Sequence, residues 1–302
     1  MLHVLLLACA GPDGPDTAVD AVRAVTRAPS VPALPALPSP IDPALRVESG
    51  FGPRRMPLED GREDFHLGLD YDAPEGTPVF AVADGVVARV DAGGESDGNV
   101  LYVEHPLDPP VTWHGATLDR FYAVYGHLSA FSVSEGDPVA TGQLVASVGD
   151  TGAAREPHLH FEIRLGTRCT LRYTTENPES TCGLGFDPAV NPYHAVPGSH
   201  AGGLDATVLA EDPYTLRLRT ADTDLDWNRV ATDLGVLDFD LRDGLDATTY
   251  DALNDLDRGW IHVVPDLPGD EEGFQAYTLT FPTPPAWVEV LDIRGEGWRF
   301  EP

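Results

Sequence analysis

The chain contains no lysine. All 19 of its basic residues are arginine, against 49 acidic residues, so the formal net charge is −30. Such a surface lacks the basic footprint that nucleic-acid binding needs, and we therefore expect no nucleic-acid partner. The sequence also lacks any apolar run of about 18 or more residues, which predicts no membrane-spanning helix. Its 302 residues are long enough for two domains with separate cores.

Cysteine is scarce, with three in the chain and no C-x-x-C pair, so a cysteine zinc site is not supported. The run Leu6-Leu7-Ala8-Cys9 looks like a bacterial lipobox. We therefore expect residues 1–11 to direct export. A lipidated Cys9 would then permit membrane attachment. A chance apolar N-terminus on a cytosolic protein is the alternative. In an oxidising compartment Cys169 and Cys182 would close a loop, which stabilises a fold by about 3 kcal/mol; two free thiols are the alternative.

Proline divides the chain. Residues 12–44 are dense in proline and are expected to form an extended linker, with a short helix over residues 16–26. Glycine and proline in residues 197–203 indicate a hinge. The chain is therefore predicted to contain one domain at 45–197 and an acidic, β-rich domain at 204–302.

The region 45–197 is predicted to be mainly β, because short runs of alternating or β-branched residues are separated by turn signals and no useful helical pattern occurs. The insert at residues 106–120 is longer than a plain hairpin loop and adds Trp113 and His114. The expected strands are Val79–Val82, Val86–Val90, Asn99–Glu104, Arg120–Tyr125, Pro138–Ala140 and Leu144–Val148.

Four histidines and one aspartate indicate a metal site: His66, Asp70, His127, His158 and His160. A catalytic zinc ion takes three protein ligands of His, Asp or Glu type and keeps one position for water. His158 and His160 lie in a strand-like run, so they are expected to share one face. The other six histidines have no motif around them and are interpreted as structural or surface residues: His3, His105, His114, His194, His200 and His262.

From Gly50 to about His194, the sequence around these residues resembles the lysostaphin-type, or LytM-family, peptidoglycan metalloendopeptidases. The runs that carry the resemblance are Ser49–Gly52, Phe65–Asp70, Ala73–Val79, Ala83–Val87, Tyr125–Ser129, Gly136–Val139, Gly142-Gln143 and Pro157–Ile163. The resemblance implies an antiparallel β-sheet fold of the duplicated hybrid motif type, with the metal in a groove.

Carried over residue by residue, the resemblance implies one Zn²⁺ held by His66, Asp70 and His160, with His127 and His158 as catalytic histidines. It implies an exported enzyme of the periplasm or cell envelope, or a secreted one, that cuts the stem peptides or cross-bridges of peptidoglycan. Two alternatives remain: a non-catalytic protein of the same fold that binds cell wall or regulates a hydrolase, and a secreted protease with another substrate.

The C-terminal region is expected to form a small β-sandwich, with one short helix at 248–256. Its strand-like runs are Tyr214–Arg219, Trp260–Val264, Ala276–Phe281 and Trp287–Val290. The acidic run from Asp222 to Asp233 imitates a calcium loop, but Trp227 stands where that loop needs glycine, so an acidic surface turn is favoured. Its tryptophans could line a sugar-binding face or serve as core residues, and we favour the core.

Overall fold

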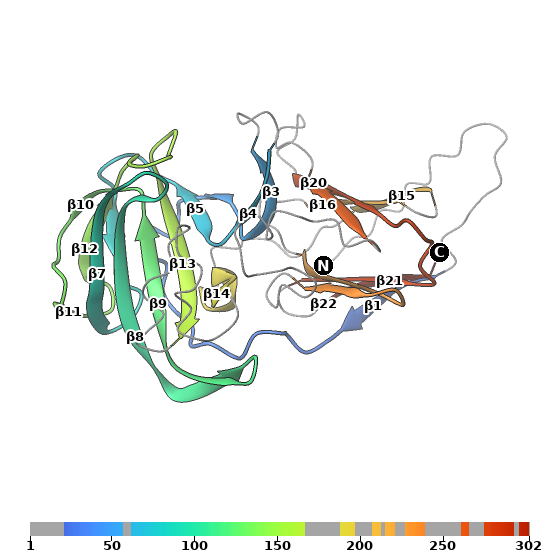
Figure 1. Ribbon diagram of the computed structural model, residues 1–302, viewed down its shortest axis with the longest axis horizontal. Helices are drawn as coiled ribbons and strands as arrows, with labels where there is room; N and C mark the ends of the chain where they lie inside the picture. Colours follow the sequence, from blue (N-terminus) through green and yellow to red (C-terminus); the bar gives the residue numbers. More distant parts are fainter. Residues whose placement is uncertain are drawn as a thin grey trace. The chain divides into compact units, whose positions relative to one another are not determined.

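A computed structural model describes residues 21–56, 62–166, 188–196, 207–212, 215–220, 227–238, 261–265, 275–292 and 296–301 (Figure 1). Within these ranges no helix is long and apolar enough to cross a lipid bilayer. The three cysteines, the acidic run up to Asp226 and the helix expected at 248–256 lie outside the described residues.

The chain divides into two compact units. The central unit comprises residues 31–51 and 66–200, and the terminal unit comprises residues 1–30, 52–65 and 201–302. The chain therefore passes between the units after residues 30, 51, 65 and 200. Compared with the predicted domains, residues 31–44 join the central unit, while residues 21–30 and 52–65 are built into the terminal one.

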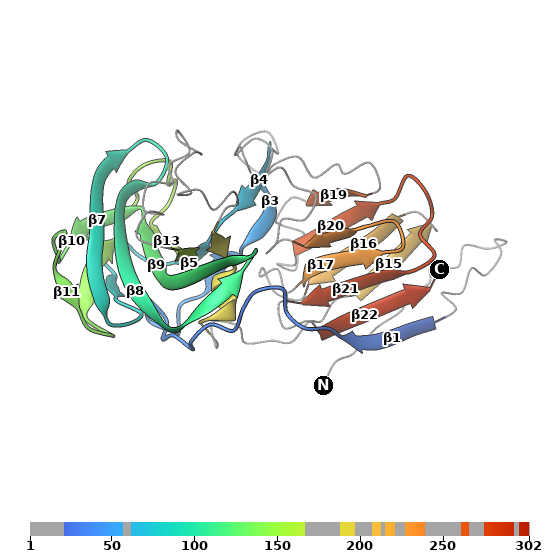
Figure 2. The same ribbon diagram turned by 60° about the horizontal axis from the view of Figure 1, so that its bottom comes forward.

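The central unit consists of antiparallel strands, as the mainly β prediction required (Figure 2). Its larger sheet has the order β11-β7-β8-β9-β13-β5-β2, with β14 also pairing with β13. These strands are β2 (Val47–Ser49), β5 (Leu69–Asp72), β7 (Gly85–Gly94), β8 (Gly98–Trp113), β9 (Ala116–Gly126), β11 (Pro138–Val139), β13 (His158–Gly166) and β14 (Ala189–Val190). The smaller sheet, β10-β12-β6, is made of β6 (Pro78–Phe80), β10 (Leu128–Phe131) and β12 (Leu144–Val148). A single 3-10 turn, η3 (Pro192–His194), follows β14.

Strand β13 separates the core from the polar face of the large sheet. Its odd-numbered side chains are apolar and fully buried: Leu159, Phe161, Ile163 and Leu165. Its even-numbered side chains therefore point to the opposite face: His158, His160, Glu162 and Arg164. One strand thus supplies both the apolar core and the row of polar groups that includes two of the predicted site residues.

The insert at 106–120 lies within strands for most of its length. Strand β8 runs on to Trp113 and β9 begins at Ala116, so most of the insert extends the β8–β9 hairpin. The prolines are accommodated by a shift of register between Pro106 and Val111. A bulge of this kind lets a strand continue where proline cannot donate to the ladder.

His105 is a structural residue of this hairpin. Its side chain is fully buried, its ring stacks on Phe121 at 4.7 Å between centroids, and its Nδ1 lies 3.1 Å from the Asp84 carbonyl oxygen. Burial is the main cause that lowers the pKa of His105 from 6.5 to about 4. The folded protein therefore keeps this imidazole neutral.

This burial predicts acid sensitivity. As the pH falls from about 6.5 towards 4, His105 binds a proton in the unfolded chain but not in the folded one. The free energy of unfolding therefore falls, by about 3 kcal/mol in all. The variant His105→Phe keeps a ring against Phe121 but has no proton to bind. Urea unfolding at pH 7 and pH 4.5 should show a smaller acid loss of stability for the variant. An identical loss in both proteins would contradict this account.

The terminal unit has two antiparallel sheets, which Figure 1 shows as separate layers. One has the order β1-β22-β21-β17-β18, from β1 (Ala21–Thr26), β17 (Trp227–Thr232), β18 (Val236–Asp238), β21 (Val288–Asp292) and β22 (Glu296–Glu301). The other has the order β15-β16-β20-β19, from β15 (Thr207–Asp212), β16 (Thr215–Thr220), β19 (His262–Pro265) and β20 (Gln275–Thr280). A further hairpin pairs β3 (Gly52–Met56) with β4 (Arg62–His66). The Arg299 guanidinium lies 4.1 Å from the centroid of the Trp287 ring and so occupies one face of that tryptophan.

The N-terminal segment is not a free linker, and the helix predicted over 16–26 is wrong from residue 21 onward. Residues 21–26 form β1, which pairs along its whole length with β22. Arg27 donates to the buried Glu289 carboxylate at 2.7 Å, and Ser30 donates to Asp238. Further along, Leu37 and Ile41 are buried in the central unit. The segment therefore supplies an edge strand to one unit and core residues to the other.

Removal of β1 should weaken the terminal unit. A protein that lacks residues 1–30 loses six strand pairings and the Arg27–Glu289 ion pair, whereas one that lacks residues 1–20 keeps both. We expect the longer deletion to melt at least about 3 °C below the shorter one, the shift that a loss of about 1 kcal/mol produces in a unit of this size. Equal melting temperatures in differential scanning calorimetry would show that β1 does not stabilise the terminal unit.

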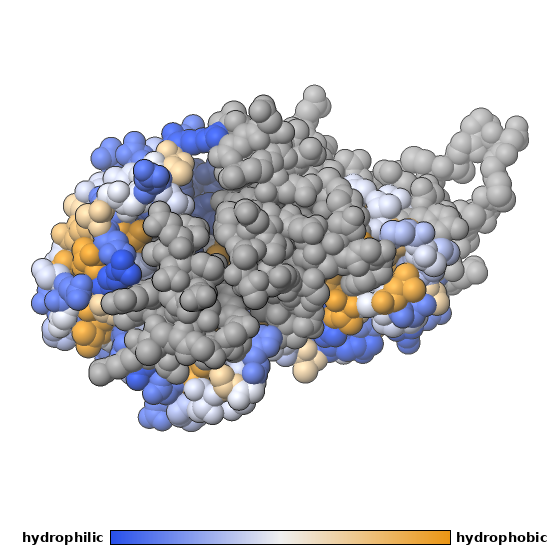
Figure 3. All heavy atoms as spheres, in the orientation of Figure 1, coloured by the Kyte–Doolittle hydropathy of each residue, from blue (hydrophilic) through white to orange (hydrophobic). Residues whose placement is uncertain are grey.

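The surface of the central unit is mixed in polarity. In Figure 3 its described residues show hydrophilic areas interrupted by small apolar patches. The large apolar side chains that are most exposed there are Val86 and Leu144, at 46% and 45%. Single exposed apolar residues are ordinary on protein surfaces, so they need no partner to explain them.

Candidate metal centre

Three strands bring the predicted metal ligands together. His66 ends β4, Asp70 lies in β5, and His160 lies in β13 directly opposite Asp70 in the pairing of those two strands. Between His66 and Asp70 the chain bends at Gly68, where an added Cβ would lie 2.5 Å from the Phe161 carbonyl oxygen and 2.9 Å from the His160 ring. Glycine is thus required for the chain to pass this close to β13.

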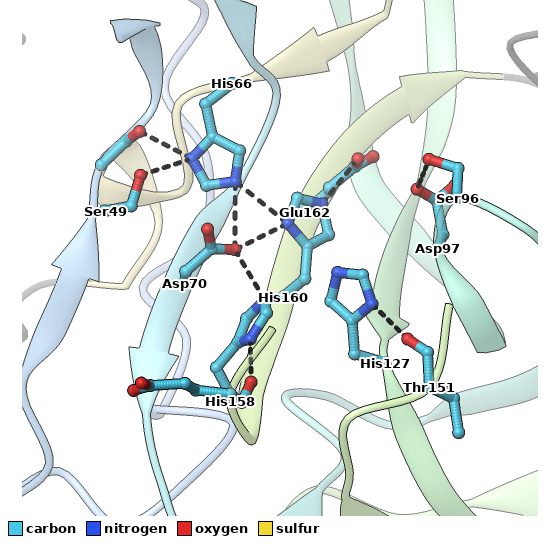
Figure 4. Close-up of polar contacts among 12 residues, drawn as sticks. Ser49, His66, Asp70, Ser96, Asp97, His127, Thr151, His158, His160 and Glu162 are labelled. Carbon is cyan, nitrogen blue, oxygen red and sulfur yellow. Dashed lines mark hydrogen bonds and ion pairs between the residues drawn. The ribbon is translucent and has the colours of Figure 1, made fainter. Parts of the chain in front are cut away.

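The donor atoms of these three residues form a compact triangle (Figure 4). Asp70 Oδ1 lies 3.1 Å from His66 Nε2 and 2.9 Å from His160 Nδ1, and the two nitrogens are 3.0 Å apart. His66 and Asp70 are buried, and the His160 side chain is 13% exposed. One small ion could contact all three atoms.

The hydrogen-bond partners of the two rings fix their tautomers. His66 Nδ1 lies 2.7 Å from the Gly50 carbonyl oxygen, which can only accept, so Nδ1 carries the proton. His160 Nε2 lies 2.9 Å from Glu162 Oε1 and donates to that carboxylate. In the neutral rings, the His66 Nε2 and His160 Nδ1 lone pairs therefore face Asp70 Oδ1 without a proton between them.

This donor set fits zinc. Three lone pairs about 3 Å apart repel one another unless a positive charge lies among them. Ligand atoms at about 2.0–2.2 Å from a tetrahedral zinc ion are about 3.3 Å from each other, close to the spacing found here. Two imidazoles and one carboxylate are also an established ligand type for catalytic zinc. These three residues could together hold a Zn²⁺ ion.

The electrostatics of the triangle also favour a cation. Burial alone would raise the pKa of Asp70, but the neighbouring His66 and the hydrogen bond that His160 donates when both of its ring nitrogens are protonated hold it well below its usual range. Burial would lower the pKa of His160, but Asp70 and Glu162 outweigh it and raise that pKa to about 10 in the metal-free arrangement. A zinc ion therefore enters in competition with a proton, and zinc affinity falls as the pH falls.

The two remaining histidines flank the triangle. The Nε2 atom of His158 lies 3.8 Å from Asp70 Oδ1, and the rings of His158 and His127 are 4.5 Å apart between centroids. His158 Nδ1 donates to the Glu156 carbonyl oxygen at 2.8 Å, and His127 Nδ1 donates to the Thr151 carbonyl oxygen at 2.8 Å. In its neutral form each ring therefore carries its proton on Nδ1 and has the lone pair on Nε2. Burial first, and the neighbouring histidines second, lower the pKa of His127 to about 4.

His127 is held in a strained backbone conformation. Its φ of 58° lies in the left-handed region, which is uncommon for a residue with a side chain. The His127 N–H donates to the Asp97 carbonyl oxygen at 2.9 Å. Thr151 Oγ1 bridges the Asn99 N–H and the Leu128 carbonyl oxygen, at 2.9 and 3.0 Å. Strain of this kind persists only where the surroundings fix it, and it is concentrated at functional sites.

All five residues predicted from the sequence therefore meet at one place. Residues 64–170 also match the model of peptidase family M23. The chain carries an M23 peptidase domain. The resemblance read from the motifs is thereby confirmed, and the central unit is a metallopeptidase domain with a mainly β, antiparallel fold.

The relatives of the M23 domain include named cell-wall enzymes. The chain is 36% identical over 142 residues to the peptidoglycan DD-endopeptidase ShyC of Vibrio cholerae, covering 47% of this chain and 30% of that protein. It is 38% identical over 120 residues to the DD-carboxypeptidase/endopeptidase Mpg of Neisseria meningitidis, covering 40% of this chain and 24% of that protein. The matched stretch thus spans less than a third of the length of either relative.

Solved structures also resemble part of the chain. A zinc containing peptidase from Vibrio cholerae is 35% identical and covers 43% of this chain and 37% of that one, with a TM-score of 0.36. The catalytic domain of lysostaphin from Staphylococcus simulans is 24% identical and covers 49% of this chain and 89% of that one, also with a TM-score of 0.36.

Sequence reasoning missed several groups that support the M23 site. Glu162 belongs to a recognised motif, but no role was predicted for it, although its spacing of two from His160 places it on the same face. Thr151, Glu156 and Gly50 act through backbone carbonyls. No side-chain pattern could have revealed those carbonyls, because every residue has one.

Proposed function

We propose that this protein is a zinc endopeptidase that hydrolyses peptide cross-links of bacterial peptidoglycan. The observation that carries the proposal is the convergence of His66 Nε2, Asp70 Oδ1 and His160 Nδ1, beside two further imidazoles whose Nδ1 atoms are held by backbone carbonyls. The names of the relatives support the substrate class. An intact ligand set favours an enzyme over a non-catalytic protein of the same fold.

The metal ligands and the two flanking histidines have different roles in the proposed hydrolysis. His66, Asp70 and His160 would hold Zn²⁺, which when bound would supply a Lewis acid for the scissile carbonyl and for a water molecule. His158 and His127 present Nε2 atoms that can take up the proton of the attacking water and deliver a proton to the leaving amine. The carbonyls of Glu156 and Thr151 fix the tautomers that this proton transfer requires.

The direct test is the digestion of purified peptidoglycan by the full chain, with and without a chelator, followed by mass spectrometry of the released fragments. We expect new peptide termini that the chelator abolishes. The position of those termini would also identify the bond that is cut. A folded, zinc-loaded protein that binds peptidoglycan without releasing fragments would instead support the non-catalytic alternative.

We also propose that the protein acts outside the cytoplasm, because peptidoglycan lies beyond the cytoplasmic membrane. Fractionation of the producing cells, followed by immunodetection, should find the protein in the envelope or the medium. Recovery in the cytosolic fraction alone would contradict this location.

A further inference from the structure

His160 differs from the other three histidines of the site in the partner of its second ring nitrogen. His66, His127 and His158 each donate to a neutral backbone carbonyl. His160 alone donates to a carboxylate, with 2.9 Å between its Nε2 and Glu162 Oε1. A carboxylate behind a metal-binding imidazole fixes the ring and makes its other nitrogen a stronger ligand.

The Glu162 carboxylate is itself held on its far side. Its Oε2 accepts a hydrogen bond from Arg164 Nε, and both side chains are buried, at 8% and 7% exposure. The three residues follow one another at every second position of β13, so they lie in a row on one face of the sheet. The row runs from the arginine through the carboxylate and the imidazole to the metal position.

Two glycines close the space around this row. An added Cβ at Gly68 would lie 3.0 Å from Glu162 Cγ and 2.9 Å from the His160 ring. At Gly126, which pairs with His160 from the other side, an added Cβ would lie 3.3 Å from His160 Cβ. The imidazole and the carboxylate are thus confined by backbone, which limits other orientations of the ring.

We propose that Glu162, held by Arg164, is the positioning residue that presents His160 Nδ1 to zinc. The inference rests on the proposed function only in assuming that zinc occupies the triangle. Glu162 acts through His160: it keeps the proton on Nε2, holds the ring in place, and adds a negative charge that makes Nδ1 a better donor. Without it, His160 is free to carry its proton on Nδ1 and so to block the metal position.

Zinc affinity of the full chain provides the first test. Competition with a chromophoric chelator at pH 7 should show about 10- to 100-fold weaker zinc binding for Glu162→Leu, the usual effect of removing such a partner. Glu162→Gln keeps an acceptor oxygen but loses the charge, so its affinity should lie between those of the parent protein and Glu162→Leu. The matched control is Glu104→Gln, which disrupts another carboxylate–arginine pair of the same sheet and should leave zinc affinity unchanged.

The tautomer provides a second test that needs no variant. Nitrogen-15 NMR of the zinc-loaded parent protein should show His160 protonated on Nε2 and unprotonated on Nδ1. Protonation on Nδ1 would overturn the proposal, even if Glu162→Leu failed to fold. Folded Glu162 variants that bind zinc within about threefold of the parent protein would also overturn it. Failure to cleave peptidoglycan would refute the proposed function instead. It would not affect the interpretation of the zinc affinities or of the His160 tautomer.

Discussion

The variant His158→Ala should retain zinc but lose almost all peptidoglycan cleavage. Its side chain lies outside the ligand triangle, with Nε2 3.8 Å from Asp70 Oδ1, so its removal leaves the three donor atoms in place. The proton transfer assigned to it contributes about 10²–10⁴-fold to a rate. We therefore expect kcat to fall by that factor while the zinc content, measured by atomic absorption, stays at one per chain.

The control for this loss is His194→Ala. His194 lies in η3 of the same unit and contributes no atom to the triangle, so this variant should retain full activity. A His158→Ala protein that cleaves at the parent rate would remove His158 from the mechanism. A His158→Ala protein that loses zinc would show that His158 helps to hold the metal.

The variant Asp70→Asn should lose zinc, and activity with it. The carboxylate contacts both histidine donors and is the only anionic ligand of the triangle. Because the pKa of Asp70 is held well below its usual range, it supplies a full negative charge at neutral pH. The loss should exceed the 10- to 100-fold effect typical of a residue one step removed from the metal, so we expect more than about 100-fold weaker zinc binding.

Chelator competition would measure this loss, and Asp91→Asn provides a matched control. Asp91 also lies on the large sheet, but it pairs with Arg89 instead of the site. Its substitution should leave zinc affinity unchanged. Zinc binding by Asp70→Asn that equals that of the parent protein would show that the triangle is not the metal site.

The face shared by His158 and His160 was predictable because it depends only on the period of two in a strand. The same period would have placed Glu162 beside His160. The carbonyls of Gly50, Thr151 and Glu156 could not be predicted, because their role depends on where the backbone passes and not on residue type.

The errors in the fold have equally local causes. Valines at every third position in residues 19–25 favoured a helix, yet Ala21–Thr26 pair with β22, which is remote in the sequence. A tertiary partner outweighs a weak local preference of this kind. Likewise, the expected strands Asn99–Glu104 and Arg120–Tyr125 are shorter than β8 and β9, because an irregularity in register absorbs Pro106, Pro109 and Pro110 within the β8–β9 hairpin.

The most direct measurement is a zinc titration of the chelator-treated full chain, with cleavage of a defined cross-linked muropeptide dimer as the readout. We expect cleavage to be absent in the metal-free protein, to rise with added zinc and to reach its plateau at one zinc per chain. Cleavage that persists without metal, or a dimer that stays intact when one zinc is bound to every chain, would contradict this expectation.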